Sequence, residues 1–183
     1  MGTPETIEIP YPPQSLEGLA VRWLQWAASI HANRSAIDDT TGQFAHLNQP
    51  EDVWFLAGCF GGRVSRTCTI PPNTKIFLPA VNEWFDVAYQ DIYGTPDVSK
   101  LYGSLSVDGI AVELDEIFIQ NFIPIKGVWG NPVNESAREH PFAIYGLWKL
   151  LEPLARGEHE IIIRGGGNDN FEMMIEYQIT VAG

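Results

Sequence analysis

The chain has little positive charge, few cysteines and no long apolar run. Its 183 residues include 11 lysines and arginines against 23 aspartates and glutamates, a formal net charge of −12. This excess of negative charge repels phosphate backbones and anionic lipid surfaces, so we expect neither nucleic acid nor a membrane as a partner. No apolar run approaches the roughly 18 residues that a membrane-spanning helix needs.

The first 13 residues lack the basic and apolar regions of a secretion signal, so we expect a cytoplasmic protein. The two cysteines, Cys59 and Cys68, flank a predicted turn, and a disulfide between them is conceivable. Without a secretion signal, two small buried hydrophobic residues are the simpler interpretation. A metal site would need further ligands at cysteine or histidine spacing; none lies near them, and we predict no metal.

Sequence motifs for common cofactors are also missing. The glycine run at 165–167 lies between two predicted strands, whereas a phosphate-binding loop joins a strand to a helix. The chain has no G-x-S-x-G nucleophile elbow and no H-E-x-x-H helix. Oxygen-bearing side chains over residues 168–172 would suit calcium, but the run lacks the length and the closing acid of an EF-hand loop. We therefore expect no cofactor.

What the chain does contain is an ordinary globular composition, 45% hydrophobic, with many turn signals. Its length is enough for one domain that buries about 70% of its unfolded surface. Eight or nine short apolar runs are separated by Gly, Pro and Asx turns, after one amphipathic segment. The pattern predicts an all-β fold, a single-domain β-sandwich of jelly-roll type over residues 53–183, with an extended arm over 1–14 and a helix over 15–31.

The predicted helix starts after Ser15, a favourable N-cap residue. Two interpretations of its apolar face remain open: a helix that packs its tryptophans on a sheet, or a lid whose aromatic side chains roof a pocket. The residues at helical spacing are Leu16, Leu19, Ala20, Trp23, Ala27 and Ile30, with Trp26 beside them.

The stretch from Val53 to Glu83 is the one around which the rest is organised. Pro79 near its end predicts a sheet edge or a bulge, because proline lacks a ladder donor. A Gly-Gly and a Pro-Pro-Asn turn predict a meander of three strands over residues 53–60, 64–70 and 76–81.

Asn82 and Glu83 end this stretch with an amide and a carboxylate side by side, where a buried strand would normally carry apolar residues. We predict that Glu83 acts as a general base, with Arg66 or His159 as its electrophilic or acid partner. The structural alternative for Glu83 and Arg66 is an ion pair that anchors two strands. His159 can equally be a buried, hydrogen-bonded residue.

A mixed aromatic and acidic run follows at residues 84–96, WFDVAYQDIYGTP. Such a run is typical either of a loop that contacts a ligand by stacking and through carboxylates, or of a short helix under a sheet edge. The predicted ligand-binding residues lie in and around this run and in a long loop over 124–141: Asn82, Trp84, Asp86, Tyr89, Tyr93 and Trp129.

Several separated motifs occur together between Trp54 and Ile161: WFLAG-x-FGG, RTCTIP, IFLPAVNE, VDG and GLW-xx-LEPL-xx-GEH-xI. In these motifs the chain resembles an uncharacterised family of small all-β proteins, over most of its length. The resemblance implies the fold and no particular reaction. Many members look secreted and carry a further cysteine just after the strand end, where this chain has Trp84 and Phe85. This departure suggests a member adapted to intracellular work on a small metabolite.

Two functions fit these features. The first is a cofactor-free acid-base enzyme, a cyclase, isomerase or lyase, that acts on a small metabolite in a pocket of the sandwich. The second is a module that binds a small ligand or carbohydrate without catalysis, with exposed aromatic side chains as stacking platforms. The helix and the expected intracellular location favour the first. We expect a small molecule as ligand or substrate, and a homo-oligomer is compatible with every feature above.

Overall fold

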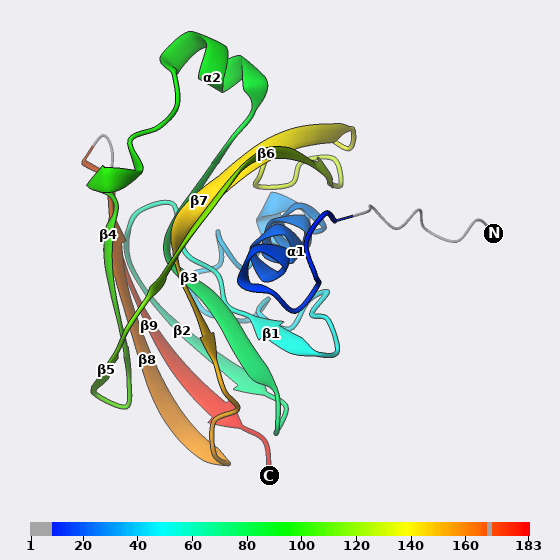
Figure 1. The fold of residues 1–183 in the computed structure, drawn as a ribbon. Coiled ribbons are helices and arrows are strands. Elements are labelled where there is room, and N and C mark those ends of the chain that lie inside the picture. The colour runs from blue at the N-terminus through cyan, green and yellow to red at the C-terminus, as the bar shows by residue number, and fades with distance from the viewer. Residues whose placement is uncertain (1–8, 168–169) are drawn as a thin grey trace, which may run out of the picture.

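The computed structural model describes residues 9–167 and 170–183, which form two packed β-sheets and a helix layer (Figure 1). The predicted all-β sandwich with an N-terminal helix is confirmed. The four-stranded sheet has the order β1-β3-β7-β6 and contains β1 (Val53–Phe55), β3 (Lys75–Phe85), β6 (Asp115–Lys126) and β7 (Glu139–Leu151). The five-stranded sheet has the order β2-β9-β8-β4-β5 and contains β2 (Gly62–Ile70), β4 (Tyr102–Val107), β5 (Ile110–Val112), β8 (Gly157–Gly166) and β9 (Glu172–Val181).

Helix α1 (Leu16–Ala28) packs its apolar face on the four-stranded sheet. Ser15 caps it as predicted, since its hydroxyl accepts a hydrogen bond from the Gly18 N–H at 3.1 Å. Trp23 is only 1% exposed and its ring meets that of Trp148 on β7 edge to face, with the centroids 5.5 Å apart. The helix therefore packs its tryptophans on a sheet, as the first of the two interpretations expects.

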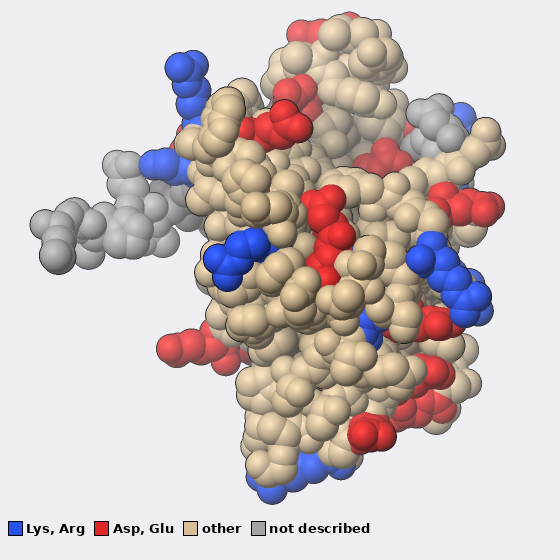
Figure 2. Space-filling view, turned by 180° about the vertical axis from the view of Figure 1, so that it is seen from behind, with Lys and Arg blue, Asp and Glu red and all other residues tan. Residues whose placement is uncertain are grey.

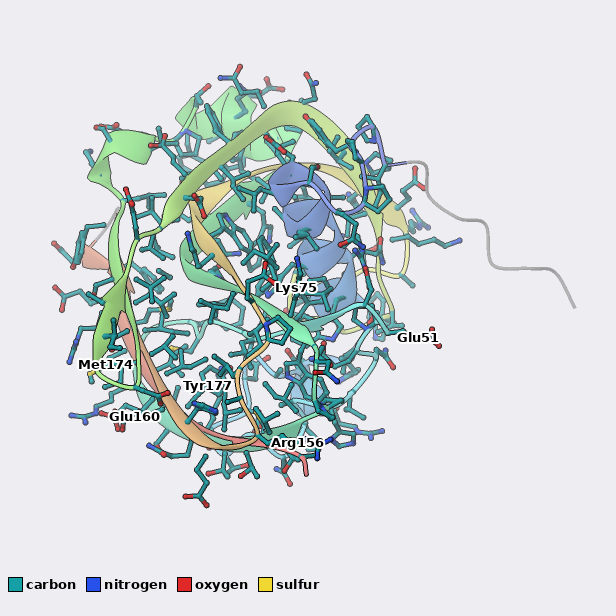
Figure 3. All side chains as sticks on the ribbon, turned by 60° about the horizontal axis from the view of Figure 1, so that its bottom comes forward. Glu51, Lys75, Arg156, Glu160, Met174 and Tyr177 are labelled. Carbon is teal, nitrogen blue, oxygen red and sulfur yellow. The ribbon has the colours of Figure 1, made fainter. Side chains whose placement is uncertain are left out.

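The four-stranded sheet is covered on both faces. Alternate residues of β3 illustrate this, because Phe77 packs in the cluster under α1 while Ile76 and Leu78 pack in the cluster between the sheets. Tyr177 of β9 points into the same space between the sheets (Figure 3). Met174 of β9 and Glu160 of β8 lie on the outer face of the five-stranded sheet. The molecule thus has three layers: helix, sheet and sheet.

The predicted meander over residues 53–81 is wrong. β1 and β3 lie side by side and parallel in the four-stranded sheet, while β2 crosses to the other sheet and pairs in parallel with β9. The first predicted strand is also short, ending at Phe55. The turn residues were interpreted correctly, since Gly61, Gly62 and Asn73 all have positive φ angles. These turns carry the chain between sheets instead of closing hairpins.

Pro79 lies at an irregularity of the β3 to β7 register between residues 79 and 81, so the predicted bulge is confirmed. It also lies beyond Phe77, where the pairing of β3 with β1 ends. The Asp-Gly hairpin between β4 and β5 is present, with Asp108 at φ 50° and Gly109 at φ 78°. The predicted loop over 124–141 is shorter, because β6 continues to Lys126 and β7 begins at Glu139.

After β3 the chain forms helix α2 (Val87–Tyr93), which stands away from the sandwich (Figure 1). Two short 3-10 helices, η1 (Ala32–Arg34) and η2 (Val98–Lys100), complete the described elements. No helix within the described ranges is long and apolar enough to cross a membrane. Acidic side chains are scattered over the face in Figure 2 and are not gathered at one point.

Candidate functional site

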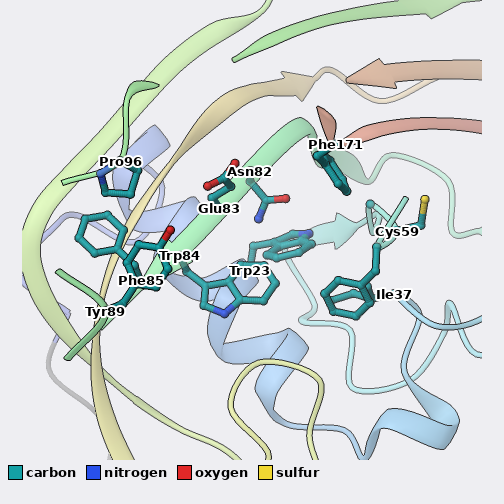
Figure 4. Close-up of a pocket in the computed structure, with 12 residues that line it drawn as sticks. Trp23, Ile37, Cys59, Asn82, Glu83, Trp84, Phe85, Tyr89, Pro96 and Phe171 are labelled. Carbon is teal, nitrogen blue, oxygen red and sulfur yellow. The ribbon is translucent and has the colours of Figure 1, made fainter. Parts of the chain in front are cut away.

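The main candidate site is a cavity of about 340 Å³ beside the second half of β3 (Figure 4). β1 pairs with β3 only from Lys75 to Phe77. The last backbone hydrogen bond between this part of the chain and β3 runs from the Leu56 N–H to the Phe77 carbonyl. Beyond it the chain over 57–60 leaves the sheet. The cavity occupies the place that a continued β1 would have taken.

A buried arginine holds the departing chain away from β3. The guanidinium of Arg66 donates to the carbonyl oxygens of Ala57 and Gly58, at 2.9 and 3.0 Å. The Tyr177 hydroxyl accepts the Ala57 N–H and donates to its carbonyl, which fixes the same residue a second time. Because both anchors belong to the five-stranded sheet, they draw residues 57 and 58 toward that sheet and leave β3 unpaired on this side.

Half of the residues that line the cavity are aromatic. Trp23 forms part of its wall from α1, Trp84 and Phe85 from β3, and Tyr89 from α2. Trp84 is held in place because its indole N–H donates to the Val133 carbonyl at 3.1 Å. Further lining residues are Ile37, Gly58, Cys59, Phe60, Pro96 and Phe171. Such walls bury apolar ligand surface and leave few polar groups to set its orientation.

The polar part of the cavity consists of Asn82 and Glu83, both half-buried. Glu83 Oε2 accepts a hydrogen bond from the hydroxyl of Tyr145, the residue opposite it on β7. Asn82 Nδ2 is buried and has no hydrogen-bond partner among the described residues. An unsatisfied buried donor costs about 1–3 kcal/mol, so this amide is a candidate for a contact with a ligand.

Four of the predicted site residues line this cavity: Asn82, Glu83, Trp84 and Tyr89. Asp86 does not; it caps α2 by accepting the Tyr89 N–H at 2.8 Å. Tyr93 is 72% exposed on the same helix and its ring lies 4.8 Å from that of Tyr89. The run over 84–96 thus contains a short helix that stands away from the sandwich, and three of its aromatic rings, those of Trp84, Phe85 and Tyr89, line the cavity.

Arg66 is not in the cavity and does not pair with Glu83. It is 1% exposed, and its remaining hydrogen bonds go to the carbonyls of Asp39 and Ile37 and to the Tyr177 hydroxyl. Every contact that the structure gives this side chain binds β2 and β9 to loop segments. Arg66 thus shapes the site from behind and takes no part in the predicted pair with the glutamate.

His159 lies on β8, beside the β4–β5 hairpin. Its Nδ1 is 2.7 Å from Asp108 Oδ2 and its Nε2 is 2.8 Å from the Ala155 carbonyl. The hydrogen bond with Asp108, followed by that with Ala155, raises the pKa of His159, and the same contact lowers the pKa of Asp108. The structure does not bring His159 to Glu83, so the predicted grouping of Glu83, Arg66 and His159 is corrected: only Glu83 reaches the cavity.

Trp129 is 76% exposed and lies in the loop between β6 and β7. The loop is tightly held, because buried Asn131 bonds to Val128, Asn134 and Ser136. Trp129 lines a second, open hollow together with His31, Asp38, Phe60 and Glu135, among others. Phe60 borders both hollows, whereas Trp129 lines only the second one.

Sequence reasoning missed several residues of the site. Tyr145 meets Glu83 because β7 pairs antiparallel with β3, a contact between residues 62 positions apart in the chain. The strand register would have been needed to find it. Phe60 and Phe171 are single aromatic residues next to turns, a signal too common to select them.

The two cysteines are free thiols in different environments. Cys59 is half-buried and lines the cavity. Cys68 is buried, and its burial raises the pKa of the thiol to about 12. No group of three or more metal-ligating side chains occurs in the part of the chain that the structure describes. The candidate calcium run includes residues 168 and 169, which lie outside the described residues.

Comparisons with known proteins give no family. No family model matches the chain, and no curated protein matches it. Two solved structures are similar in part: PbICP-C in complex with falcipain-2, with a TM-score of 0.29 and 6% identity over 74% of this chain and 95% of that one, and Amebosin in solution, with a TM-score of 0.27 and 9% identity over 64% and 96%. Likenesses this low carry no argument about function.

Proposed function

We propose that the protein binds a small organic molecule in the cavity beside β3. The apolar part of the ligand packs against the aromatic walls, and a polar group of the ligand meets Asn82 and Glu83. One observation carries the proposal: the unpartnered amide of Asn82 lies next to the carboxylate of Glu83 in an otherwise apolar cavity. Half a turn of the amide exchanges its oxygen and nitrogen, so that the donor can face a ligand acceptor.

Binding without catalysis is supported better than catalysis, because two of the three predicted catalytic residues lie elsewhere. A cavity of about 340 Å³ falls at the lower end of the range for small-molecule sites. The ligand is therefore a small molecule, with more apolar than polar surface.

The thiol of Cys59 offers a direct test. Alkylation of Cys59 by iodoacetamide is followed by mass spectrometry in the presence of a set of neutral aromatic ketones, alcohols and amides. A compound that occupies the cavity slows the labelling of Cys59, and it no longer does so in Gly58→Leu, whose added side chain narrows the space near Met173 and Asn82. Equal protection in wild type and Gly58→Leu, or no protection by any compound, would contradict the proposal.

The second candidate is the acid-base enzyme, in which Glu83 is the group that accepts and returns a proton. The hydrogen bond between Tyr145 and Glu83 favours it, since a buried hydroxyl at the carboxylate holds it in one orientation. Glu83→Gln keeps the shape of the side chain and removes the base. For a compound that wild type converts, this variant should lose turnover at least 100-fold with an almost unchanged melting temperature. Retained turnover would remove Glu83 from the chemistry.

A further inference from the structure

The ligand class follows from where the cavity lies on β3. Four consecutive residues of this strand, Asn82 to Phe85, line it. Successive side chains of a strand point to opposite faces, so a cavity on one face would be lined by alternate residues only. A cavity that touches four residues in a row runs along the edge of the strand. This edge is free because β1 pairs only with Lys75 to Phe77 and β7 occupies the other side.

A free strand edge presents backbone groups in a fixed pattern. In the antiparallel ladder of β3 and β7, every second residue of β3 exchanges its hydrogen bonds with β7, and the residues between turn their N–H and C=O groups the other way. Two of the four residues over 82–85 therefore offer an N–H and a C=O to the cavity. Edges of this kind accept an extended chain as an additional strand.

The length of the free edge limits the size of what can bind. The cavity borders β3 only from Asn82 to Phe85, between the end of the β1 pairing at Phe77 and the start of α2 at Val87. Four strand residues span roughly 10 Å at about 3.4 Å per residue. This length accommodates about three residues of extended chain, and it is too short for a full strand of another protein.

The two sides of the edge suit apolar side chains. Trp23 and Trp84, which pack in the cluster under α1, form one wall, and Phe85, which packs in the cluster with Tyr145, forms the other together with Tyr89. An extended peptide sends alternate side chains to opposite sides, so each wall would receive one.

From this geometry we propose that the ligand is a short linear peptide of about three residues with apolar side chains. It binds in the extended conformation as an added strand beside β3. This inference rests on the proposed small-molecule site and adds the ligand's chemical class. The backbone amides supply most of the polar contacts, and Asn82 and Glu83 meet one end of the chain.

The test uses the full chain and a mixture of N-acetylated, C-amidated tripeptides of Val, Phe and Tyr, together with neutral aromatic ketones and alcohols that carry no amide. Native mass spectrometry identifies the tripeptides that bind. The best one is then compared with three analogues, each N-methylated at a different amide. We expect methylation of an amide that faces β3 to weaken binding at least 10-fold and methylation of its neighbours to change it less than 3-fold.

Three outcomes would overturn the proposal. If all three methylated analogues bind as well as the parent, or if only the amide-free compounds bind, the edge does not recognise a backbone while the small-molecule site stands. If neither tripeptides nor amide-free compounds bind, the proposed function fails as well. Hydrogen exchange supplies an independent reading: on peptide binding, two alternate amides among residues 82–85 should slow at least 10-fold, and unchanged exchange there contradicts the added strand.

Discussion

Arg66 carries a positive charge in the interior of the protein. Each nitrogen of its guanidinium group donates a hydrogen bond, either to a backbone carbonyl of the loops over 37–39 and 57–58 or to the Tyr177 hydroxyl. Its replacement by Met removes these donors and leaves several carbonyl groups buried without partners. We predict that Arg66→Met lowers the free energy of unfolding by about 3–5 kcal/mol, measured by urea denaturation.

The control for this variant is Arg63→Met on the same strand. The Arg63 side chain is 66% exposed and pairs only with Glu176 at the surface. Its loss should change stability by less than about 1 kcal/mol. Similar losses for the two variants would mean that the buried contacts of Arg66 do not fix the loops.

The two thiols differ enough to be told apart by alkylation. Cys59 borders the cavity, while Cys68 is buried and its pKa is raised to about 12. Iodoacetamide should therefore add one group to the native protein at Cys59 and two only after unfolding, as read from the intact mass. Rapid double labelling of the native protein would show that the packing around Cys68 is looser than the structure has it.

Asp108 and His159 make stability depend on pH. Because the pKa of His159 is raised in the folded protein, this residue contributes its full share to folding stability below pH 6.5, its ordinary pKa. The contribution is lost as the pH rises through the higher pKa of the folded state. The lowered pKa of Asp108 means that its contribution is present above its ordinary value of 3.8 and is lost as the pH falls through the lower folded value.

Asp108→Asn should accordingly be destabilised most between about pH 4 and pH 6.5 and approach wild type at alkaline pH. The asparagine can still accept the Glu160 N–H and adopt a positive φ angle, so the turn is kept. The effect is small, since 47% of the Asp108 side chain is exposed. A stability difference that does not change with pH would assign the contact no electrostatic role.

At the scale of elements, β8 of one sheet passes close to the bulge of β3 in the other at Gly165. A methyl group on Gly165 would come within 2.1 Å of the Ala80 carbonyl oxygen, which is backbone and cannot turn aside. We predict that Gly165→Ala lowers the free energy of unfolding by about 1–3 kcal/mol, because a local separation of the sheets is needed to fit it.

Gly58→Ala is the matched control, because the added carbon meets only Met173 at 3.5 Å and Asn82 at 3.9 Å. Both glycines are buried and neither has a φ angle in the left-handed region. A thermal denaturation curve for each variant should show a marked shift for Gly165→Ala alone. Equal shifts would mean that the close approach of Gly165 to the Ala80 carbonyl does not determine the cost.

Local signals in the sequence predicted single elements well. The Ser15 cap, the Gly-Gly turn and the Pro-Pro-Asn turn all depend on neighbouring residues, and all are present. The pairing of β1, β2 and β3 could not be predicted in this way, because a turn that reverses the chain can join strands of one sheet or of two. Long-range contacts decide it, among them the parallel pairing of β2 with β9.

At the scale of the whole molecule, the site arises from one sheet that is locally incomplete. The sequence indicated Asn82 and Glu83 because polar residues at a strand end are unusual, and it indicated Trp84 through the mixed aromatic and acidic run that begins there. It did not indicate that Arg66 is the buried anchor behind the cavity or that Tyr145 meets Glu83, because both facts depend on which strands are neighbours. His159 was selected by residue type alone, and the fold places it with Asp108.

The central claim is that the gap beside β3 is a ligand site. Native mass spectra of wild type and Gly58→Leu, recorded side by side with the same mixture of tripeptides and amide-free aromatic compounds, test it most directly. The account predicts a bound compound on wild type and none on the variant, with both proteins folded by circular dichroism. No bound compound on wild type, or the same compound bound equally to both proteins, would contradict it.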